Sequence, residues 1–538
     1  MQKQAIPICG DFGDDETIIR ERDATDEADM ENNQFSMPWR VLFLFLFAIE
    51  ILPIWFFTFF PSHDGPSHIY NAYVLKSFFT GTPPRIAEYY KLNAFPFPNW
   101  SSHPFMGTLM LIVTPETAHK ILLTVILTLF PLSIFYFLEA VKKQKSIYVV
   151  VGFLFNYHFM LHYGFYNFSL SAPFYFFSLG YYWKHKDSFN IKKLFILTLL
   201  MLATYFCHMI TFTLLVSSLT LLVITAQYKQ PCQLLKHLAG VVPFLVVMVA
   251  FILQFSYGER REYFAKKYWL EYFFDIGSLV YYTDAHFFIT RPLVIVGIMV
   301  FLATLLQIYF KKKSAEPVWH FLVIALLLSS LYFILPWRLA SGALLNDRVN
   351  FFIFLVVLPF LSEDFSRQFK RALVAFLVVA CIVHVGITYR YYYYLDKGLR
   401  EFTSARHLIE PDSTVLALSS DWWSYEIDVH YVEPFVQAVN YYCLNNGCVN
   451  LGNYEAQFDY FPVNWSKKHS GKIDYVIAWK LTTGGNIWST DFEAGGWQNI
   501  DLRALRKSLK TDYDLIYFSG KNLKLYRHKS LRDHGSEY

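Results

Sequence analysis

The chain is long, apolar and close to electrical neutrality. Of its 538 residues, 54% are hydrophobic, 20% are aromatic and 17% are charged, and the formal net charge is +4. This composition is too apolar for a soluble protein with ordinary charge usage, so we expect the chain to lie in a lipid bilayer. The small net charge offers no basic field, and no nucleic-acid motif is present, which excludes nucleic acid as a partner.

The first 38 residues are polar and strongly acidic. A cleavable signal peptide would begin with a basic region instead. We therefore predict a disordered cytoplasmic tail over 1–38.

Long apolar segments follow this tail up to residue 389. A span needs roughly 20 apolar residues, each rising about 1.5 Å, to cross a hydrocarbon core of about 30 Å. This rule predicts a mostly α polytopic helix bundle over 39–389. Its expected spans are 39–60, 105–140 (with a break at Pro115), 146–163, 165–183, 194–226, 238–256, 289–310, 317–335, 346–362 and 371–389.

Clusters of basic residues indicate how the bundle is oriented. The clusters are KKQK at 142–145, KHK at 184–186 with Lys192 and Lys193, KKK at 311–313 and RQFKR at 367–371. The positive-inside rule places such clusters in the cytoplasm. All of them fall on that side if 194–226 forms two short helices that fold back near His208. We therefore expect about eleven crossings of an inner or plasma membrane, with the N-terminus cytoplasmic.

Residues 390–538 have a different composition and predict a soluble α/β domain outside the membrane. Its β-like runs lie at 413–418, 474–479, 514–518 and 523–528, between turn signals such as NNG and TTGG. Roughly 150 residues of this kind can form one small domain. Two of its cysteines share the stretch CLNNGC, and the sequence leaves open whether Cys443 and Cys448 form a disulfide.

The loop after the first span, PSHDGPSHIYNAYVLKSFFTG at 61–81, is the most informative stretch. Asp64 precedes Gly65 and Pro66, and proline favours the first turn of a helix, so Asp64 is predicted at or near a helix N-cap. One side of this helix is apolar, which predicts a position in the membrane interface. On the other side Asp64, His68 and Asn71 follow at spacings of four and three, so their side chains converge. A carboxylate at a helix N-terminus favours its ionised form, as a general base requires.

These features resemble the GT-C superfamily, whose members are membrane glycosyltransferases that use polyprenyl-phosphate-linked sugars. The resemblance covers residues 39–538 as architecture: an acidic residue in the first outer loop (Asp64, within HDGPSH), a helix after it, many spans and a C-terminal domain outside. Local similarity to bacterial members extends to three stretches. They are GFYNFSLSAPFYFFSLG at 164–180, ATYFCHMITF at 203–212 and NDRVNFFIFLVVLPF at 346–360.

The resemblance implies a hexosyl- or pentosyltransferase of the cell envelope. The donor would be a polyprenyl-phosphate sugar, the acceptor a lipid, a glycan or a protein, and Asp64 the base. Arg348 is the first candidate to bind the leaving phosphate, because a guanidinium fork matches phosphate oxygens. Other cations could serve instead, namely Arg260, Arg261, Lys266 and Lys267. The side chains expected to line the substrate site are His68, Asn71, His162, Asn167 and His208.

No cofactor is expected. The first loop lacks the DxD or ExD pair that binds metal in the oligosaccharyltransferases of this superfamily, which favours chemistry without a metal. A metal site built from His63, Asp64 and His68 is conceivable by ligand type, but these three residues have no recognised ligand spacing.

Simpler interpretations stand beside each functional one. Asp64 could be a helix cap only, Arg348 could anchor its helix end by snorkelling, and His208 could be a hydrogen-bonded core histidine. Glu50 lies inside the first span, where a charge is costly and usually functional, and it favours a lipid or sugar transporter or flippase. A non-catalytic membrane assembly protein would need only the spans and the tail.

Overall fold

The computed structural model describes residues 36–531 except for 96, 257–260, 264–267, 281–282, 312–318, 340–341, 423–431, 467–472, 482–487 and 490–501. The chain divides into two compact units, residues 1–50 and 51–538. Helix α2 (Ser36–Phe56) runs across this division and contains Glu50. The predicted acidic tail up to residue 35 and the loop cations Arg260, Lys266 and Lys267 lie outside the described residues.

Long apolar helices dominate the described chain, as the composition predicts. Among the described residues, six helical segments are long and apolar enough to cross a membrane. They belong to α2, α6 (Pro115–Lys142), α11 (Met209–Gln227), α12 (Pro231–Ser256), α15 (Phe287–Lys311) and α18 (Arg367–Phe402). The mostly helical architecture is confirmed and is consistent with a membrane protein, whereas the count of eleven crossings and the orientation stay predictions.

Two predicted breaks in the helices are confirmed. Residues 105–140 divide into α5 (Ser102–Leu109) and α6, and α6 begins at Pro115 with the Thr114 side chain accepting a hydrogen bond from the Thr117 N–H. Residues 194–226 divide into α10 (Ile191–Cys207) and α11, because His208 between them is extended, with φ −160° and ψ 123°.

Two other predicted spans are shorter than expected. The segment 146–163 is interrupted into η1 (Ile147–Val149), α7 (Val150–Leu154) and α8 (Phe159–Tyr163), and the His158 side chain caps α8 by accepting from the Leu161 N–H. Helix α17 (Leu345–Val356) is 12 residues long, so at about 1.5 Å per residue it rises only about 18 Å. Neither segment is therefore one continuous helix, and their crossing of the membrane stays a prediction.

The last long helix extends past the predicted start of the C-terminal domain. Helix α18 has 36 residues and continues to Phe402, so the change of composition at residue 390 lies inside a helix. The other predicted helices are present as α9 (Tyr166–His185) and α16 (Trp319–Ile334).

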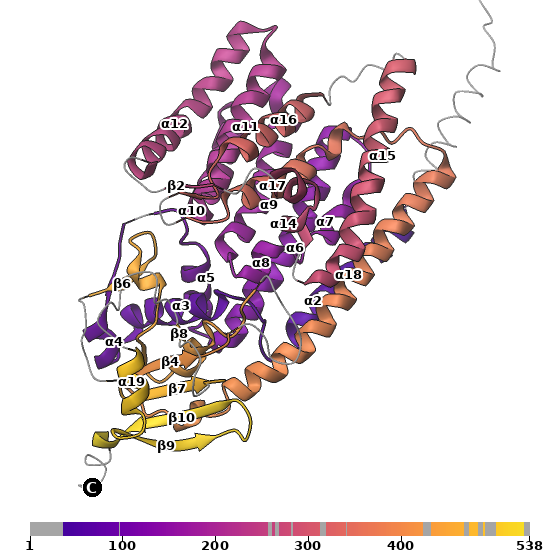
Figure 1. The fold of residues 1–538 in the computed structure, drawn as a ribbon. Coiled ribbons are helices and arrows are strands. Elements are labelled where there is room, and N and C mark those ends of the chain that lie inside the picture. The colour runs from indigo at the N-terminus through magenta and orange to yellow at the C-terminus, as the bar shows by residue number, and fades with distance from the viewer. Residues whose placement is uncertain are drawn as a thin grey trace, which may run out of the picture. The chain divides into compact units, whose positions relative to one another are not determined.

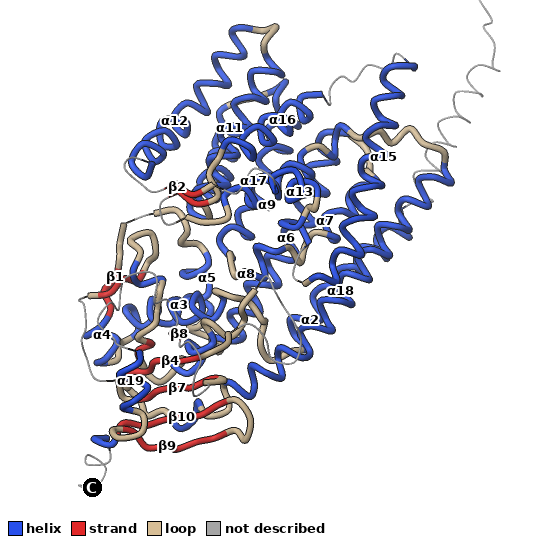
Figure 2. The backbone as a smooth tube through the Cα atoms, viewed as in Figure 1, coloured by secondary structure: helices blue, strands red, loops and turns tan. Residues whose placement is uncertain are grey.

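A mixed sheet follows α18, and all four predicted strands are confirmed in it. The strands β4 (Thr414–Ser419), β7 (Tyr475–Trp479), β10 (Leu523–His528) and β9 (Tyr513–Phe518) lie side by side in that order (Figure 1). β4 is parallel to β7, whereas β10 is antiparallel to both of its neighbours. The short strands β5 (Val449–Asn450) and β8 (Trp488–Ser489) pair with β4, and Figure 2 shows the strands in red. The position of this sheet outside the membrane stays a prediction.

The first loop is joined directly to the C-terminal part of the chain. Its helix α3 (Gly65–Thr80) packs against α5 and against η7 (Ala438–Cys443). Its strand β1 (Tyr90–Leu92) pairs antiparallel with β6 (Val463–Trp465). Residues 65–75 of α3 are all buried in protein, so most of the apolar side of the helix covers protein, whereas Phe79 near its end is 73% exposed. The position of the helix in the membrane interface stays a prediction.

The helix has the predicted ends. Gly81 follows it with φ +118°, a conformation that L side chains rarely adopt.

The Tyr70 hydroxyl donates a hydrogen bond to the Cys448 carbonyl at 2.8 Å. Cys448 and Cys443 are buried, unbridged thiols in this structure.

Two buried asparagines form a reciprocal pair between the loop and the C-terminal part. Asn71 Nδ2 donates to Asn453 Oδ1 at 3.0 Å, and Asn453 Nδ2 donates to Asn71 Oδ1 at 2.9 Å. Neither side chain has exposed surface. Each amide therefore gives the other one donor and one acceptor, while Asn71 Nδ2 also donates to the Ser67 carbonyl and Asn453 Nδ2 to the Tyr90 hydroxyl.

We expect Asn71→Ala and Asn453→Ala each to lower the stability of the protein by about 1–3 kcal/mol, because each leaves a buried amide without its partner. The double variant should lose less than the sum of the two, with a coupling of about 1 kcal/mol. Thermal unfolding in detergent measures this cycle. Asn190, which caps α10, is the control: Asn190→Ala should combine additively with Asn71→Ala. Additive losses for Asn71 and Asn453 would contradict the pairing.

Candidate functional site

The backbone around Asp64 lies against the turn that precedes α9. The His63 N–H donates to the His162 carbonyl at 3.1 Å, and the Asp64 N–H donates to the Tyr163 carbonyl at 3.0 Å. Gly164 has φ +94°, and a Cβ placed there would lie 2.8 Å from Asp64 N and 2.7 Å from Gly65 N. Only glycine permits this approach of the two backbones.

Gly65 makes a second close approach. A Cβ at this position would lie 2.1 Å from both the Ser62 hydroxyl and the Tyr166 hydroxyl, which are themselves 2.8 Å apart. The Tyr166 hydroxyl also lies 2.7 Å from His119 Nε2, on α6. Packing against Ser62 and Tyr166 therefore requires glycine at position 65, in addition to its place at the start of the helix.

The chain entering the loop is also fixed by charged side chains. One oxygen of the buried Asp396, on α18, accepts from the Phe59 N–H at 2.7 Å, and the other accepts from Arg400 Nε at 2.7 Å. Lys120, on α6, donates to the Phe57 carbonyl at 2.7 Å. Two long helices thus determine where the loop begins.

Asp64 occupies the predicted N-cap position of α3, but its side chain makes no capping hydrogen bond. Its carbonyl instead accepts from the Ser67 and His68 N–H groups, at 2.9 and 3.2 Å. The interpretation of Asp64 as a cap alone is therefore weakened. Its side chain is 11% exposed, and Oδ1 lies 3.7 Å from His63 Nε2.

Arg348 lies inside the protein, next to the turn that contacts Asp64. The residue is 8% exposed, and its guanidinium lies over the Phe165 ring at 4.4 Å. Phe165 directly follows Gly164, which contacts the Asp64 backbone. Arg348 NH1 lies 3.4 Å from His208 Nε2. A snorkelling arginine would reach out to the membrane surface, so this burial disfavours the anchoring interpretation. The structure brings together three predicted site residues: Asp64, His208 and Arg348.

Three other predicted substrate-binding residues have protein partners. Asn71 pairs with Asn453, as described above. Asn167 Oδ1 accepts from the Ser102 N–H at 2.8 Å, and its Nδ2 donates to the Asn99 carbonyl at 2.8 Å. His162 Nε2 lies 2.8 Å from the Tyr392 hydroxyl. These contacts give all three a positioning role, and their contact with a sugar stays a prediction.

His68 belongs to a buried cluster that also contains His103 and Glu455. His68 Nδ1 lies 2.9 Å from Glu455 Oε1, His103 Nε2 lies 2.8 Å from Glu455 Oε2, and the two imidazole nitrogens are 3.4 Å apart. The Glu455 and His103 side chains have no exposed surface, and that of His68 is 5% exposed. Among the described residues, these three form the one group of histidine, cysteine and acidic side chains with the spacing to hold a metal ion.

The three groups influence one another's protonation. Burial raises the pKa of Glu455, but the two histidines more than offset this and lower it to about 2. Burial lowers the pKa of His68, yet the charge and hydrogen bond of Glu455, together with the charge of Asp64, outweigh it, and the pKa is raised overall. Burial lowers the pKa of His103 more than Glu455 raises it. The cluster therefore holds one carboxylate, with His68 favoured as its protonated partner.

Sequence reasoning did not find His103 and Glu455. Glu455 lies 352 residues beyond His103, and no spacing rule connects positions so far apart. The conceived metal site of His63, Asp64 and His68 is not the group that forms, because His68 turns to Glu455 instead. The expectation of chemistry without a metal stays a prediction.

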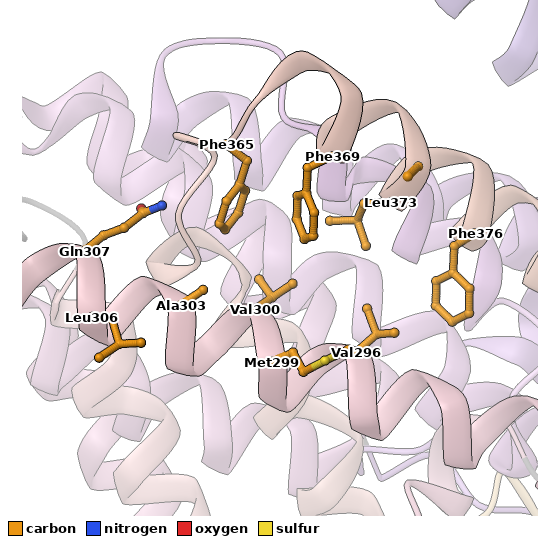
Figure 3. A pocket seen from close by; sticks show the side chains of 11 residues that line it. Val296, Met299, Val300, Ala303, Leu306, Gln307, Phe365, Phe369, Leu373 and Phe376 are labelled. Carbon is orange, nitrogen blue, oxygen red and sulfur yellow. The ribbon is translucent and has the colours of Figure 1, made fainter.

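An apolar pocket of about 690 Å³ lies elsewhere, between α15 and the first half of α18 (Figure 3). Its lining includes Val296, Met299, Phe369 and Phe376. Phe376 precedes Tyr392, the partner of His162, by 16 residues, which is about 24 Å along a helix. This pocket has almost no polar lining and is separate from the Asp64 site.

A comparison with protein-family models finds no match for the chain, and a search of curated proteins finds none either.

We expect Gly164→Ala to displace the Asp64 loop, because the new methyl group would overlap the backbone at Asp64 and Gly65. Gly520 is a matched control: it has φ +84°, but a Cβ there meets nothing within 4 Å. Both variants carry the strain of a left-handed alanine, so a larger fall in thermal midpoint for Gly164→Ala measures the overlap itself. Hydrogen exchange of residues 61–70 should rise in that variant alone. Equal effects of the two variants would contradict the close approach.

Proposed function

We propose that this chain is a membrane glycosyltransferase that moves a sugar from a polyprenyl-phosphate-linked donor to an acceptor at the outer membrane face. Asp64 is its base. The observation that carries the proposal is that the buried Arg348 lies over Phe165, directly after the Gly164 turn that contacts the Asp64 backbone, and that the Asp64 side chain does not cap its own helix.

The arrangement suits a single displacement. The acceptor must lose a proton as it attacks the anomeric carbon, and a carboxylate at a helix N-terminus is ionised and able to accept that proton. The leaving phosphate gains negative charge, and a guanidinium offers it two parallel hydrogen bonds. Because Arg348 is buried, its interaction with a phosphate would be screened less than at a surface.

His208 supports Arg348 from the break between α10 and α11. Its Nε2 lies 3.4 Å from the guanidinium, and its ring packs edge-on against Phe168 at 5.4 Å. A histidine accepting from the arginine would aim the guanidinium fork. We assign His208 a positioning role in phosphate binding.

The two rival functions have less support. A transporter would gather polar groups on interrupted helices at mid-membrane. The polar groups described above lie around the first loop instead. Glu50 is the feature that favours transport. A non-catalytic assembly protein would not require an aspartate and an arginine to converge inside the protein.

We expect Asp64→Asn to lower release of polyprenyl phosphate from lipid-linked sugars by roughly 10²–10⁴-fold, because asparagine keeps the shape but cannot accept the proton. The assay uses purified protein in nanodiscs, a panel of lipid-linked sugars and candidate acceptors. Asp421→Asn is the matched control, since Asp421 pairs with Lys480 in the C-terminal part of the chain. Full turnover by a folded Asp64→Asn variant would remove Asp64 from the mechanism. A wild type that consumes no lipid-linked sugar would favour the transporter or the assembly protein.

We expect Arg348→Lys to lower the same turnover by roughly 10–100-fold, because lysine keeps the charge but loses the fork that matches phosphate oxygens. Most of the loss should appear in the KM for the donor. Arg85→Lys is the control, since Arg85 bonds the Asp412 carbonyl and Glu88 away from the site. An unchanged KM for Arg348→Lys would exclude Arg348 as the phosphate ligand.

A further inference from the structure

We propose that His68, His103 and Glu455 bind one divalent transition-metal ion of the zinc type. The three ligands come from three separate elements: α3, α5 and η8 (Glu455–Gln457). The site lies beside Asp64 but does not depend on the proposed transfer reaction. It also replaces the sequence-based expectation of a protein without a metal.

The distances are near those that such an ion needs. Bonds of about 2.0–2.1 Å in a tetrahedral site hold neighbouring ligand atoms about 3.3–3.4 Å apart. His68 Nδ1 and His103 Nε2 already have this separation, at 3.4 Å. Their distances to Glu455, 2.9 and 2.8 Å, run to different oxygens, so the carboxylate has to turn and move back by about half an ångström to offer one oxygen to the ion.

Glu455 Oε1 has an ion-pair partner but no well-aligned hydrogen bond among the described residues. It is fully buried and lies 2.9 Å from His68 Nδ1. A carboxylate oxygen has lone pairs beyond the one that such a contact uses. A metal ion between the three side chains would bind to them.

The surroundings resemble those of known imidazole metal sites. His103 Nδ1 lies 3.5 Å from the Ser102 hydroxyl, so its other nitrogen, Nε2, is the one directed at the cluster. The Phe461 ring lies 6.1 Å from the His68 ring and 5.7 Å from the His103 ring. A second hydrogen bond that orients each imidazole and an apolar shell around the ligands are both usual for metal sites.

The ligand set also selects the class of ion. Imidazole nitrogens suit zinc, cobalt or nickel, whereas magnesium and calcium prefer a shell of oxygen atoms. Two histidines and one glutamate leave a fourth position of a tetrahedral zinc ion for water. The competing description is a bare His68–Glu455–His103 ion pair and hydrogen bond without metal, and the experiment below separates the two.

Binding would connect distant parts of the chain. Glu455 is 352 residues from His103, and the reciprocal pair of Asn71 and Asn453 lies next to the same junction. An ion held by all three ligands would fasten the first loop to the C-terminal part. Its removal should therefore lower the thermal midpoint of the whole chain.

The test uses the full chain purified in detergent without a polyhistidine tag. Metal analysis should find about one zinc ion per chain. After chelation, added Zn²⁺ should restore the thermal midpoint, and added Co²⁺ should produce the visible absorption bands of a tetrahedral cobalt site. A chelated wild type that binds neither ion and shows no change in midpoint overturns the proposal.

Two variants locate the site. Glu455→Gln and His103→Gln remove one ligand each with little change of volume, and each should weaken metal binding at least about 10–100-fold. His407→Gln is the matched control, because His407 is exposed and outside the cluster, and it should keep full binding. Full stoichiometry in both ligand variants would overturn the assignment to these residues. If a variant does not fold, the cobalt spectrum of the wild type still decides between the metal site and the bare ion pair. A failed transfer assay with one bound zinc ion would reject the proposed function alone.

Discussion

The fully buried carboxylate of Glu455 constrains the arrangement of the site more than any other group. Glu455 is enclosed on all sides, and a buried charge is tolerated only when it is paired. Its partners are His68 and His103, which both belong to the first third of the chain. The first loop cannot reach its final position until the C-terminal part arrives, and the C-terminal part cannot bury Glu455 without the loop. The two must therefore fold as one structure.

Backbone contact supplies the second constraint. The loop at Asp64 touches the turn at Gly164 so closely that neither Gly164 nor Gly65 has room for a side chain. Such contact leaves the backbone at Asp64 little freedom to move. Around it, Asn167 and His162 hold neighbouring segments in place through their own hydrogen bonds.

Interruptions in the helices bring the remaining polar groups to the same region. His208 lies where α10 ends and α11 begins, and Arg348 lies in the first turn of the short helix α17. In an apolar bundle a charged or polar side chain needs partners nearby, because neither lipid nor an apolar interior can solvate it. The edge of Phe168 and the face of Phe165 provide part of the environment of these two residues.

The sequence by itself determined the features that depend on neighbouring residues. The apolar helices, the start of α6 at Pro115, the separation of α10 from α11 and the four strands of the C-terminal sheet all follow from local patterns, and the structure has them. The start of α3 after Asp64 follows from the Asp-Gly-Pro order for the same reason. Only the tertiary structure decided the burial of α3, the interruption of 146–163, the partners of Asn71 and the His68, His103 and Glu455 cluster. These features join residues up to several hundred positions apart, and periodicity and spacing carry no information about contacts at that separation.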